Sequence, residues 1–207
     1  MENLVTKNVT FEGLLATLDN SKELVFDFIM NLKNKEVKAR LCDEARDYYA
    51  TYFNIKKEDV WYGNLTRNEI PTPFPYTHIV GDLNWIVGKD MSKLVYVAGN
   101  IKHSYIEEYA NLEVITGFGD FYNSCIKSLP KLKKVGCLGL SNSPIEDIHS
   151  LVLVESFLAC NNTNIKYVNP DLEIMGTLHC EISNHFEEKL DKTKKHNWWY
   201  TDNPKIL

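Results

Sequence analysis

The chain has 207 residues, 44% of them apolar and 12% aromatic, so it can bury a core and is not expected to be disordered. Its net charge of −5 is spread along the sequence, and arginine occurs only at Arg40, Arg46 and Arg67, so nucleic acid is not an expected partner. The first residues lack a secretory signal pattern, and no stretch approaches the roughly 18 apolar residues that span a bilayer. We therefore expect a soluble cytoplasmic protein with no membrane partner.

Apolar residues recur at helical spacing from residue 10 to about residue 53 and predict three helices. Thr10 and Ser21 are expected N-caps, and Asn20 and Asn34 fall between the helices. The aromatic segment 48–53 could present a surface to a partner, but aromatic stripes at this spacing more commonly pack against an adjoining domain. We expect residues 1–55 to form a helical cap.

Residues 56–77 are expected to be a connector. Helical periodicity fades there, and Pro71, Pro73 and Pro75 exclude both a helix and a central strand.

A repeat of 19 or 20 residues follows and carries the fold prediction. Glycines recur 18 to 20 residues apart, and all of them except Gly117 precede two residues in alternate positions that are typical of a strand burying one face. An apolar triplet then closes each turn. The glycines are Gly81, Gly99, Gly117, Gly136 and Gly176, with Ser156 in the same series; the pairs are Leu83 and Trp85, Ile101 and His103, Leu138 and Leu140, Leu158 and Cys160, and Leu178 and Cys180; the triplets run from Ile106, Tyr109 and Leu112 to Ile165, Val168 and Leu172.

This pattern predicts an α+β protein in which the helical cap precedes a β solenoid of five to six turns over residues 78–182. Because a stack of turns exposes its two end edges, we expect a second cap at residues 183–207. Its apolar residues are Phe186, Leu190, Trp198, Trp199 and Tyr200.

The segment LKKVGCLGLSNSPIEDI, residues 132–148, resembles the short leucine-rich repeats common in bacterial and phage proteins. Residues at the positions typical of that family are Leu132, Val135, Leu138, Leu140, Asn142, Ile145 and Ile148. The resemblance extends over residues 77–181 and is weakest in the turn 112–131, where Gly119 replaces a core leucine. It implies a curved solenoid whose strand face binds proteins, and it implies no chemistry. The first 70 residues resemble no family.

Candidate chemistry is sparse. The five cysteines are far apart among apolar residues, which favours buried thiols over disulfides or a metal site built from Cys160, His179, Cys180 and His185. Acid–base pairs could combine Asp120, Glu107 or Glu108 with His103 or His149, but the chain has no phosphate-binding loop, nucleophile elbow or acidic cluster. We expect no metal, no cofactor and no catalysis, with an enzyme of unrecognised type as an alternative.

Residues between the inward positions of each strand should form three outward rows. These rows bring together the residues that we predict to bind a protein partner, since aromatic anchors among polar groups are typical of interface centres. The predicted binding residues are Phe118, Asp120, Tyr122, Phe157, Lys102 and His179. Alternatively, Phe118 and Tyr122 belong to the core in a shifted register, or a terminal segment covers the face.

The sequence thus predicts a protein–protein interaction module that acts as an inhibitor or adaptor by occupying a partner protein. A phage or mobile-element protein that acts on a protein in the host cytoplasm is one example. In an alternative, the N-terminal helices bind the target and the repeats serve as a scaffold.

Overall fold

The computed structural model describes residues 9–180 and 197–199. Contacts within the chain divide it into a helical unit, residues 1–63, and a solenoid unit, residues 64–207. Among the described residues, no helix is long and apolar enough to cross a lipid bilayer.

The helical unit contains the three predicted helices, and side chains cap each of them at its N-terminus. Thr10 accepts a hydrogen bond from the Gly13 amide, and Ser21 accepts one from the Leu24 amide, as predicted. Asn34 caps the third helix. The elements are α1 (Phe11–Thr17), α2 (Lys22–Met30), α3 (Lys35–Phe53), the short 3-10 helix η2 (Lys57–Asp59) and strand β1 (Val60–Tyr62).

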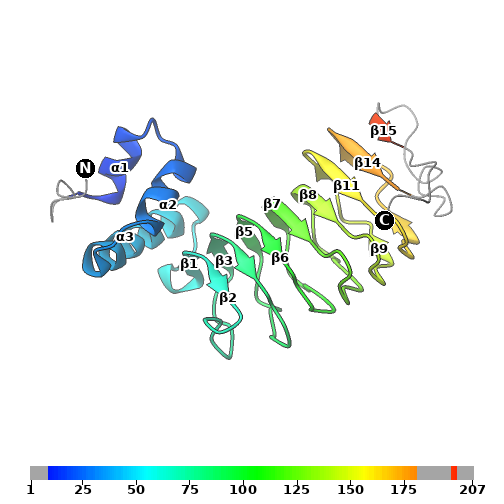
Figure 1. Ribbon diagram of the computed structural model, residues 1–207, viewed down its shortest axis with the longest axis horizontal. Helices are drawn as coiled ribbons and strands as arrows, with labels where there is room; N and C mark the ends of the chain where they lie inside the picture. Colours follow the sequence, from blue (N-terminus) through cyan, green and yellow to red (C-terminus); the bar gives the residue numbers. More distant parts are fainter. Residues whose placement is uncertain (1–8, 181–196, 200–207) are drawn as a thin grey trace. The chain divides into compact units, whose positions relative to one another are not determined.

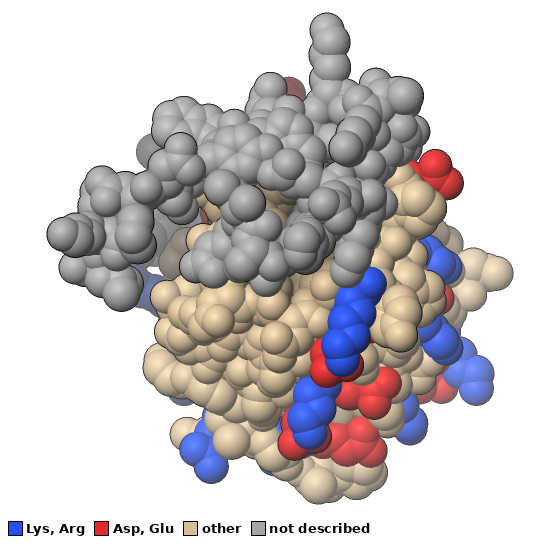
Figure 2. Space-filling model, turned by 90° about the vertical axis from the view of Figure 1, so that its right-hand side faces the viewer, with Lys and Arg blue, Asp and Glu red and all other residues tan. Residues whose placement is uncertain are grey.

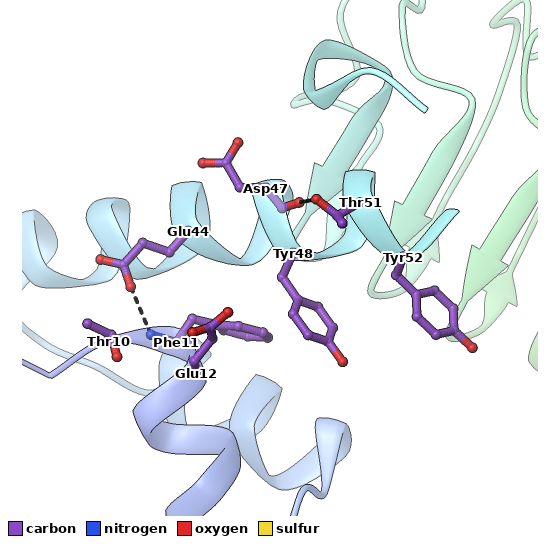
Figure 3. Close-up of a pocket in the computed structure, with 8 residues that line it drawn as sticks. All are labelled: Thr10, Phe11, Glu12, Glu44, Asp47, Tyr48, Thr51 and Tyr52. Carbon is purple, nitrogen blue, oxygen red and sulfur yellow. Dashed lines mark hydrogen bonds between the residues drawn. The ribbon is translucent and has the colours of Figure 1, made fainter. Parts of the chain in front are cut away.

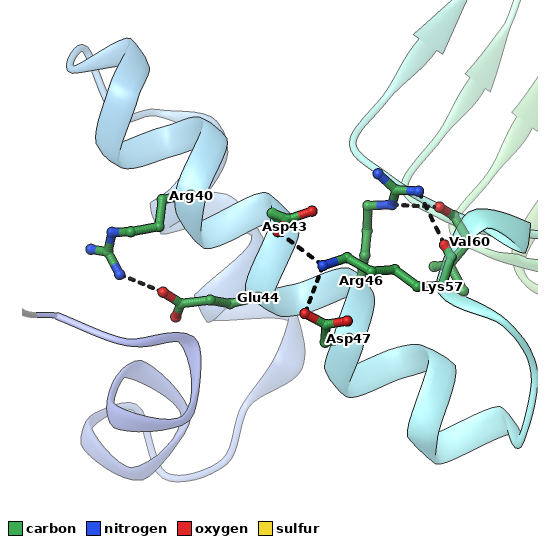
Figure 4. Close-up of polar contacts among 7 residues, drawn as sticks. All are labelled: Arg40, Asp43, Glu44, Arg46, Asp47, Lys57 and Val60. Carbon is green, nitrogen blue, oxygen red and sulfur yellow. Dashed lines mark hydrogen bonds and ion pairs between the residues drawn. The ribbon is translucent and has the colours of Figure 1, made fainter.

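One charged side chain connects α3 to the segment that follows it. The Arg46 guanidinium donates hydrogen bonds to the carbonyl oxygens of Val60, at 2.8 Å, and Lys57, at 3.1 Å (Figure 4). Lys57 in turn pairs with Asp43 and Asp47 on α3, and the Asp47 hydrogen bond is the main cause of the raised pKa of Lys57.

The solenoid unit is a stack of parallel turns, about six in number, as predicted (Figure 1). Each complete turn contributes a strand segment to two parallel ladders, and some turns add a third. The first ladder comprises β3 (His78–Val80), β5 (Tyr96–Ala98), the beginnings of β7 (Val114–Asp120) and β8 (Lys134–Gly139), β10 (Leu153–Val154) and β13 (Glu173–Ile174).

The second ladder runs beside the first and carries the predicted binding face. It comprises β2 (Leu65–Thr66), β4 (Leu83–Asn84), β6 (Ile101–Lys102), the ends of β7 and β8, β11 (Phe157–Ala159), β14 (Thr177–His179) and β15 (Asn197–Trp199). The third ladder contains β9 (Asp147–Ile148) and β12 (Tyr167–Val168).

The register agrees with the repeat in the later turns, where Leu138 pairs with Leu158 and Leu158 with Leu178. The solenoid begins earlier than expected, because β2 lies in the predicted connector and pairs with β4. The predicted C-terminal cap lies outside the described residues except for 197–199, whose backbone extends the second ladder.

The core is built from the inward residues of each turn. Four of the turns carry an apolar triplet, and these triplets are buried apart from half-buried Val168. The inward residues of both main ladders are buried as well. In the irregular turn, Gly119 pairs with Ile101 and Leu138, so it does occupy the core column. The side chains of Ile115, Phe121 and Leu138 fill the space that a larger residue would need.

Turn length changes along the solenoid because one bend of each turn changes position. We call this bend, which ends the second-ladder strand, the second corner; a residue with a left-handed backbone marks it. It comes two positions after the buried residue in the early turns, at Trp85 and His103, and four positions after it in later turns, at Asn142 and Asn162. Equivalent residues are therefore 18 apart in the early turns and 20 apart in the late ones.

Two details of the strand prediction are wrong for this reason. Trp85 and His103 do not point into the core, because the chain turns at these residues and both are exposed. The third of the predicted outward rows does not exist as a row. Alternation along the strands places Ile86, Ser104, Tyr122, Ser141, Asn161 and Glu181 in it, but Ile86, Ser104 and Ser141 are buried where the chain bends inward.

The recurring glycines lie at the first corner, the bend between the first-ladder and second-ladder strands of each turn. Close stacking of the turns at this corner explains them. Consecutive turns stack there so closely that a Cβ on Gly99 would lie 2.4 Å from the Gly81 carbonyl oxygen, and one on Gly136 would lie 2.5 Å from that of Thr116. Such contacts are with backbone and cannot be relieved by side-chain rotation. The period of the glycines is thus the period of a backbone contact.

After the first corner, an amide ladder joins the early turns. The Asn64 side chain accepts a hydrogen bond from the Asp82 amide, Asp82 accepts one from Asn100, and Asn100 accepts one from Phe118, each at 2.8 Å. The Asn100 side-chain amide also donates to Asp82 at 2.9 Å. The ladder ends at Phe118, where the outward column becomes aromatic.

We predict that Asn100→Ala lowers the free energy of unfolding by about 1 to 2 kcal/mol, because it leaves the partly buried Phe118 amide without its acceptor. Chemical denaturation checks this value. Thr116→Ala, an exposed change on β7, is the control and should cost less than about 0.5 kcal/mol. Equal effects of the two changes would show that the ladder does not contribute to stability.

Candidate functional site

The predicted binding residues lie on the outward side of the second ladder, in two adjacent columns. Phe118 and Phe157 belong to the column that follows the first corner, and Lys102, Asp120 and His179 belong to the next column. All five are half-buried, and Tyr122, just beyond the strand, is 50% exposed. We call these six residues the aromatic face.

Three rings of the aromatic face contact one another across several turns. The Phe118 and Phe157 ring centroids are 5.4 Å apart, and Phe157 meets His179 edge-on at 6.5 Å. This continuity depends on Gly139, since a Cβ there would lie 3.2 Å from the Phe118 ring. The ring therefore lies over a position that has no side chain, and it extends the aromatic column toward Phe157.

Charged groups flank the rings and hold the local backbone. The Lys102 ammonium group lies 3.4 Å from the Asp82 carboxylate, and Asp120 accepts a hydrogen bond from the Tyr122 amide at 3.2 Å. Aromatic rings, one ammonium group and two carboxylates thus occupy a continuous part of the second ladder.

Trp85 and His103 extend this surface and were not predicted as binding residues. Their rings stack with centroids 4.3 Å apart at an interplanar angle of 20°, and Trp85 is 54% exposed. Both have a left-handed backbone, with φ of 58° and 54°. Later turns place Asn123, Asn142 and Asn162 at this kind of corner, and asparagine tolerates the conformation far better than a bulky residue does. Because Trp85 and His103 are both exposed, burial in the core does not explain why these two residues occupy the corners of the early turns.

Other charged residues of the solenoid form rows of ion pairs between turns. Lys127 pairs with Glu107 at 2.7 Å and Lys166 with Glu146 at 2.9 Å, in both cases 20 residues apart. Hydrogen bonds to these carboxylates raise the pKa of both lysines. Figure 2 shows lysines and carboxylates alternating on the surface. Exposed pairs of this kind contribute little free energy, so the rows keep the rest of the surface polar.

The helical unit has a groove of about 580 Å³ between the start of α1 and one side of α3 (Figure 3). Aromatic rings and carboxylates line it, and none of its lining residues is basic. The lining residues are Thr10, Phe11, Glu12, Glu44, Asp47, Tyr48, Thr51 and Tyr52.

Most of the groove is engaged in packing within the unit. Phe11 lies 5.2 Å from Tyr48 between ring centroids, and Glu44 accepts a hydrogen bond from the Phe11 amide. Tyr52 is 62% exposed, and the Lys22 ammonium group lies 4.0 Å from its ring centroid. The segment 48–53 therefore packs mainly within its own unit and leaves one tyrosine exposed.

A catalytic arrangement is not apparent in the predicted acid–base residues. Glu107 is paired with Lys127, Asp120 binds the Tyr122 amide, and His103 stacks on Trp85. Within residues 9–180 and 197–199, no three His, Cys, Asp or Glu side chains are grouped to hold a metal ion. His185 of the proposed metal set lies outside these residues.

One surface cluster has the order of atoms of a catalytic triad. His149 Nδ1 is 2.6 Å from Asp147 Oδ1, and its Nε2 is 3.3 Å from Ser150 Oγ. However, Ser150 donates its hydroxyl hydrogen to the Pro130 carbonyl at 2.5 Å, which removes the proton from the side where His149 could accept it. The His149 side chain is exposed, so the cluster does not line an enclosed site. The Ser150 hydrogen bond to Pro130 instead links two neighbouring turns of the solenoid.

No family model, curated protein or solved structure matches this chain.

Proposed function

We propose that the protein is a non-enzymatic binding module that contacts a partner protein through the aromatic face and the Trp85–His103 stack. The observation that carries the proposal is the exposed Trp85, held in a left-handed corner that is costly for a bulky residue, with the His103 ring stacked on it. Strained backbone conformations of this kind cluster at functional sites, including those that bind ligands. Exposed aromatic anchors with polar neighbours are also the usual centre of a protein interface.

The sequence resemblance supports the same proposal at a finer level. We infer that the turns are leucine-rich-repeat-like, because Asn142 occupies a left-handed corner after the buried residues Leu138 and Leu140. Binding by occupancy, as an inhibitor or adaptor, requires no reacting group. The carboxylates and histidines discussed above are engaged in local pairs and stacks, which is consistent with a module without catalytic activity.

Trp85→Asn separates recognition from folding. Asparagine tolerates the left-handed backbone, which offsets the loss of the stack with His103, so the free energy of unfolding should change by less than about 1 kcal/mol. Loss of an exposed tryptophan anchor should weaken partner binding by about tenfold or more. Thermal unfolding and a binding isotherm measure the two quantities. A folded variant with unchanged affinity would exclude the stack from the interface.

The groove of the helical unit supports a second candidate, in which the helices contact the target. Exposed Tyr52 and the carboxylate of Glu12 are its accessible groups. Tyr52→Ala combined with Glu12→Lys in the full chain should leave binding unchanged if the aromatic face is the contact surface. A loss of affinity in that variant, with affinity retained in Trp85→Asn, would favour the helices.

A further inference from the structure

Cys160 and Cys180 occupy the same column on neighbouring turns of the solenoid. They directly follow the register in which Leu158 pairs with Leu178 and Ala159 with His179, and the Cys160 amide donates to the His179 carbonyl at 2.8 Å. Neighbouring strands are about 4.8 Å apart, which lies within the range of about 4.4 to 6.8 Å between Cα atoms in disulfides. The backbone therefore already has a spacing that permits a bond between the two sulfur atoms.

The two thiols differ in accessibility. Cys160 is fully buried in the core column that Leu140 occupies one turn earlier, whereas Cys180 is partly exposed. A hydrogen bond with Cys180, together with burial, raises the pKa of Cys160 well above its usual range. An oxidant from solution thus reaches Cys180 first, and Cys160 lies in contact with it.

We propose that Cys160 and Cys180 form an oxidation site, which a low-molecular-weight disulfide such as oxidised glutathione converts into an intrachain disulfide. The Cys180 thiolate attacks the glutathione disulfide, forming a mixed disulfide and releasing one glutathione thiolate. Cys160 then gives its proton to the released glutathione thiolate through solvent and attacks the Cys180 sulfur, which breaks the mixed disulfide and releases the second glutathione as a thiolate that takes up a proton from water. Two protein thiols are oxidised and one glutathione disulfide is reduced to two thiols. The inference is independent of the proposed binding function.

Cys137, another cysteine of the second ladder, illustrates the selectivity of this pair. Cys137 is partly exposed, but its neighbours on the adjacent turns are Phe118 and Phe157, so it has no thiol partner in register. It can carry a glutathione adduct, but it cannot resolve that adduct within the ladder.

The disulfide would join the turns that carry Phe157 and His179 of the aromatic face. A covalent link between residues 160 and 180 restricts the unfolded chain and so favours the folded state. Oxidation would therefore stabilise this end of the solenoid without changing the chemistry of its outward columns.

The test uses the full-length reduced protein, incubated folded with excess oxidised glutathione, alkylated, and digested with trypsin, which cuts between the two cysteines at Lys166. Mass spectrometry should find the peptides that contain Cys160 and Cys180 joined, and the thiol count should fall by two from the five of the reduced chain once adducts on other cysteines are excluded by mass. The midpoint of thermal unfolding should rise by about 4 °C or more.

Cys160→Ala provides the control, because Cys180 should then retain a glutathione adduct that the wild type loses to the cross-link. A stable adduct on Cys180 of the wild type would overturn the proposal, as would a cross-link that involves Cys137 instead. Cross-linking that occurs only after denaturation would overturn it as well. The wild-type measurement remains decisive even if the variant does not fold.

Discussion

Gly136→Ala should destabilise the solenoid by about 3 kcal/mol or more, although it adds only one methyl group. The new Cβ would lie 2.5 Å from the carbonyl oxygen of Thr116 and 2.7 Å from that of Gly117, and both atoms belong to the backbone of the preceding turn. Relief requires the two turns to separate, which breaks ladder hydrogen bonds and opens the core between them. Denaturant unfolding of the two proteins measures the difference.

Two nearby changes serve as controls for this effect. Gly139→Ala lies on the same strand, but its Cβ would meet the end of the Phe118 ring at 3.2 Å, and that ring can move. Ser156→Ala lies at a corner that already holds a Cβ. Each should change stability by less than about 1 kcal/mol. If Gly136→Ala were as mild as these two changes, close stacking at the first corner would not be the reason for the recurring glycines.

The repeat predicted the architecture because its period reports contacts between turns. The glycine series reflects backbone stacking, and the buried triplets reflect a core that neighbouring turns share. The N-caps at Thr10 and Ser21 were predictable because the residue types that cap helices are few. Each of these features leaves a local signal in the sequence.

The second corner left a weaker signal. A two-residue difference in turn length moves the left-handed residue from Asn142 in a late turn to His103 in an early one. A period of 19 or 20 applied throughout therefore placed Trp85 and His103 in the core, and it placed buried Ile86 outside. Two observations could have suggested the shift: the glycines at 81, 99 and 117 are 18 apart whereas later members of the series are 19 or 20 apart, and asparagine recurs at 123, 142 and 162 but not in the first turns.

The aromatic face was predictable in position but not in its internal contacts. Alternation along the strand placed Phe118 and Phe157 outward even in the irregular turn. Their contact joins residues two turns apart, and it depends on the absence of a side chain at Gly139. Contacts of this kind depend on stacking geometry, which residue spacing alone does not contain.

Phe157→Ala combined with Asp120→Lys should weaken partner binding by about 100-fold or more. Truncation of an aromatic anchor at an interface centre costs about 2 kcal/mol, and the reversed charge adds repulsion to a surface complementary to Asp120. Because Phe157 is only half-buried, its contacts with Phe118 and His179 should contribute no more than about 1.5 kcal/mol to stability. Binding and folding should therefore separate.

Leu140→Ala is the matched control, since its fully buried side chain contributes to folding and does not reach the outward columns. It should cost about 2 to 5 kcal/mol of stability and leave affinity unchanged at temperatures where it is folded. The two variants are thus expected to show opposite patterns of stability and affinity.

The most direct test of the binding function is the dissociation constant of a partner captured from the native host, measured by calorimetry for the wild type, the double variant and Leu140→Ala. We expect wild-type affinity for Leu140→Ala and an affinity at least about 100-fold weaker for the folded double variant. A folded double variant that binds within about threefold of the wild type would contradict the assignment of the aromatic face as the contact surface.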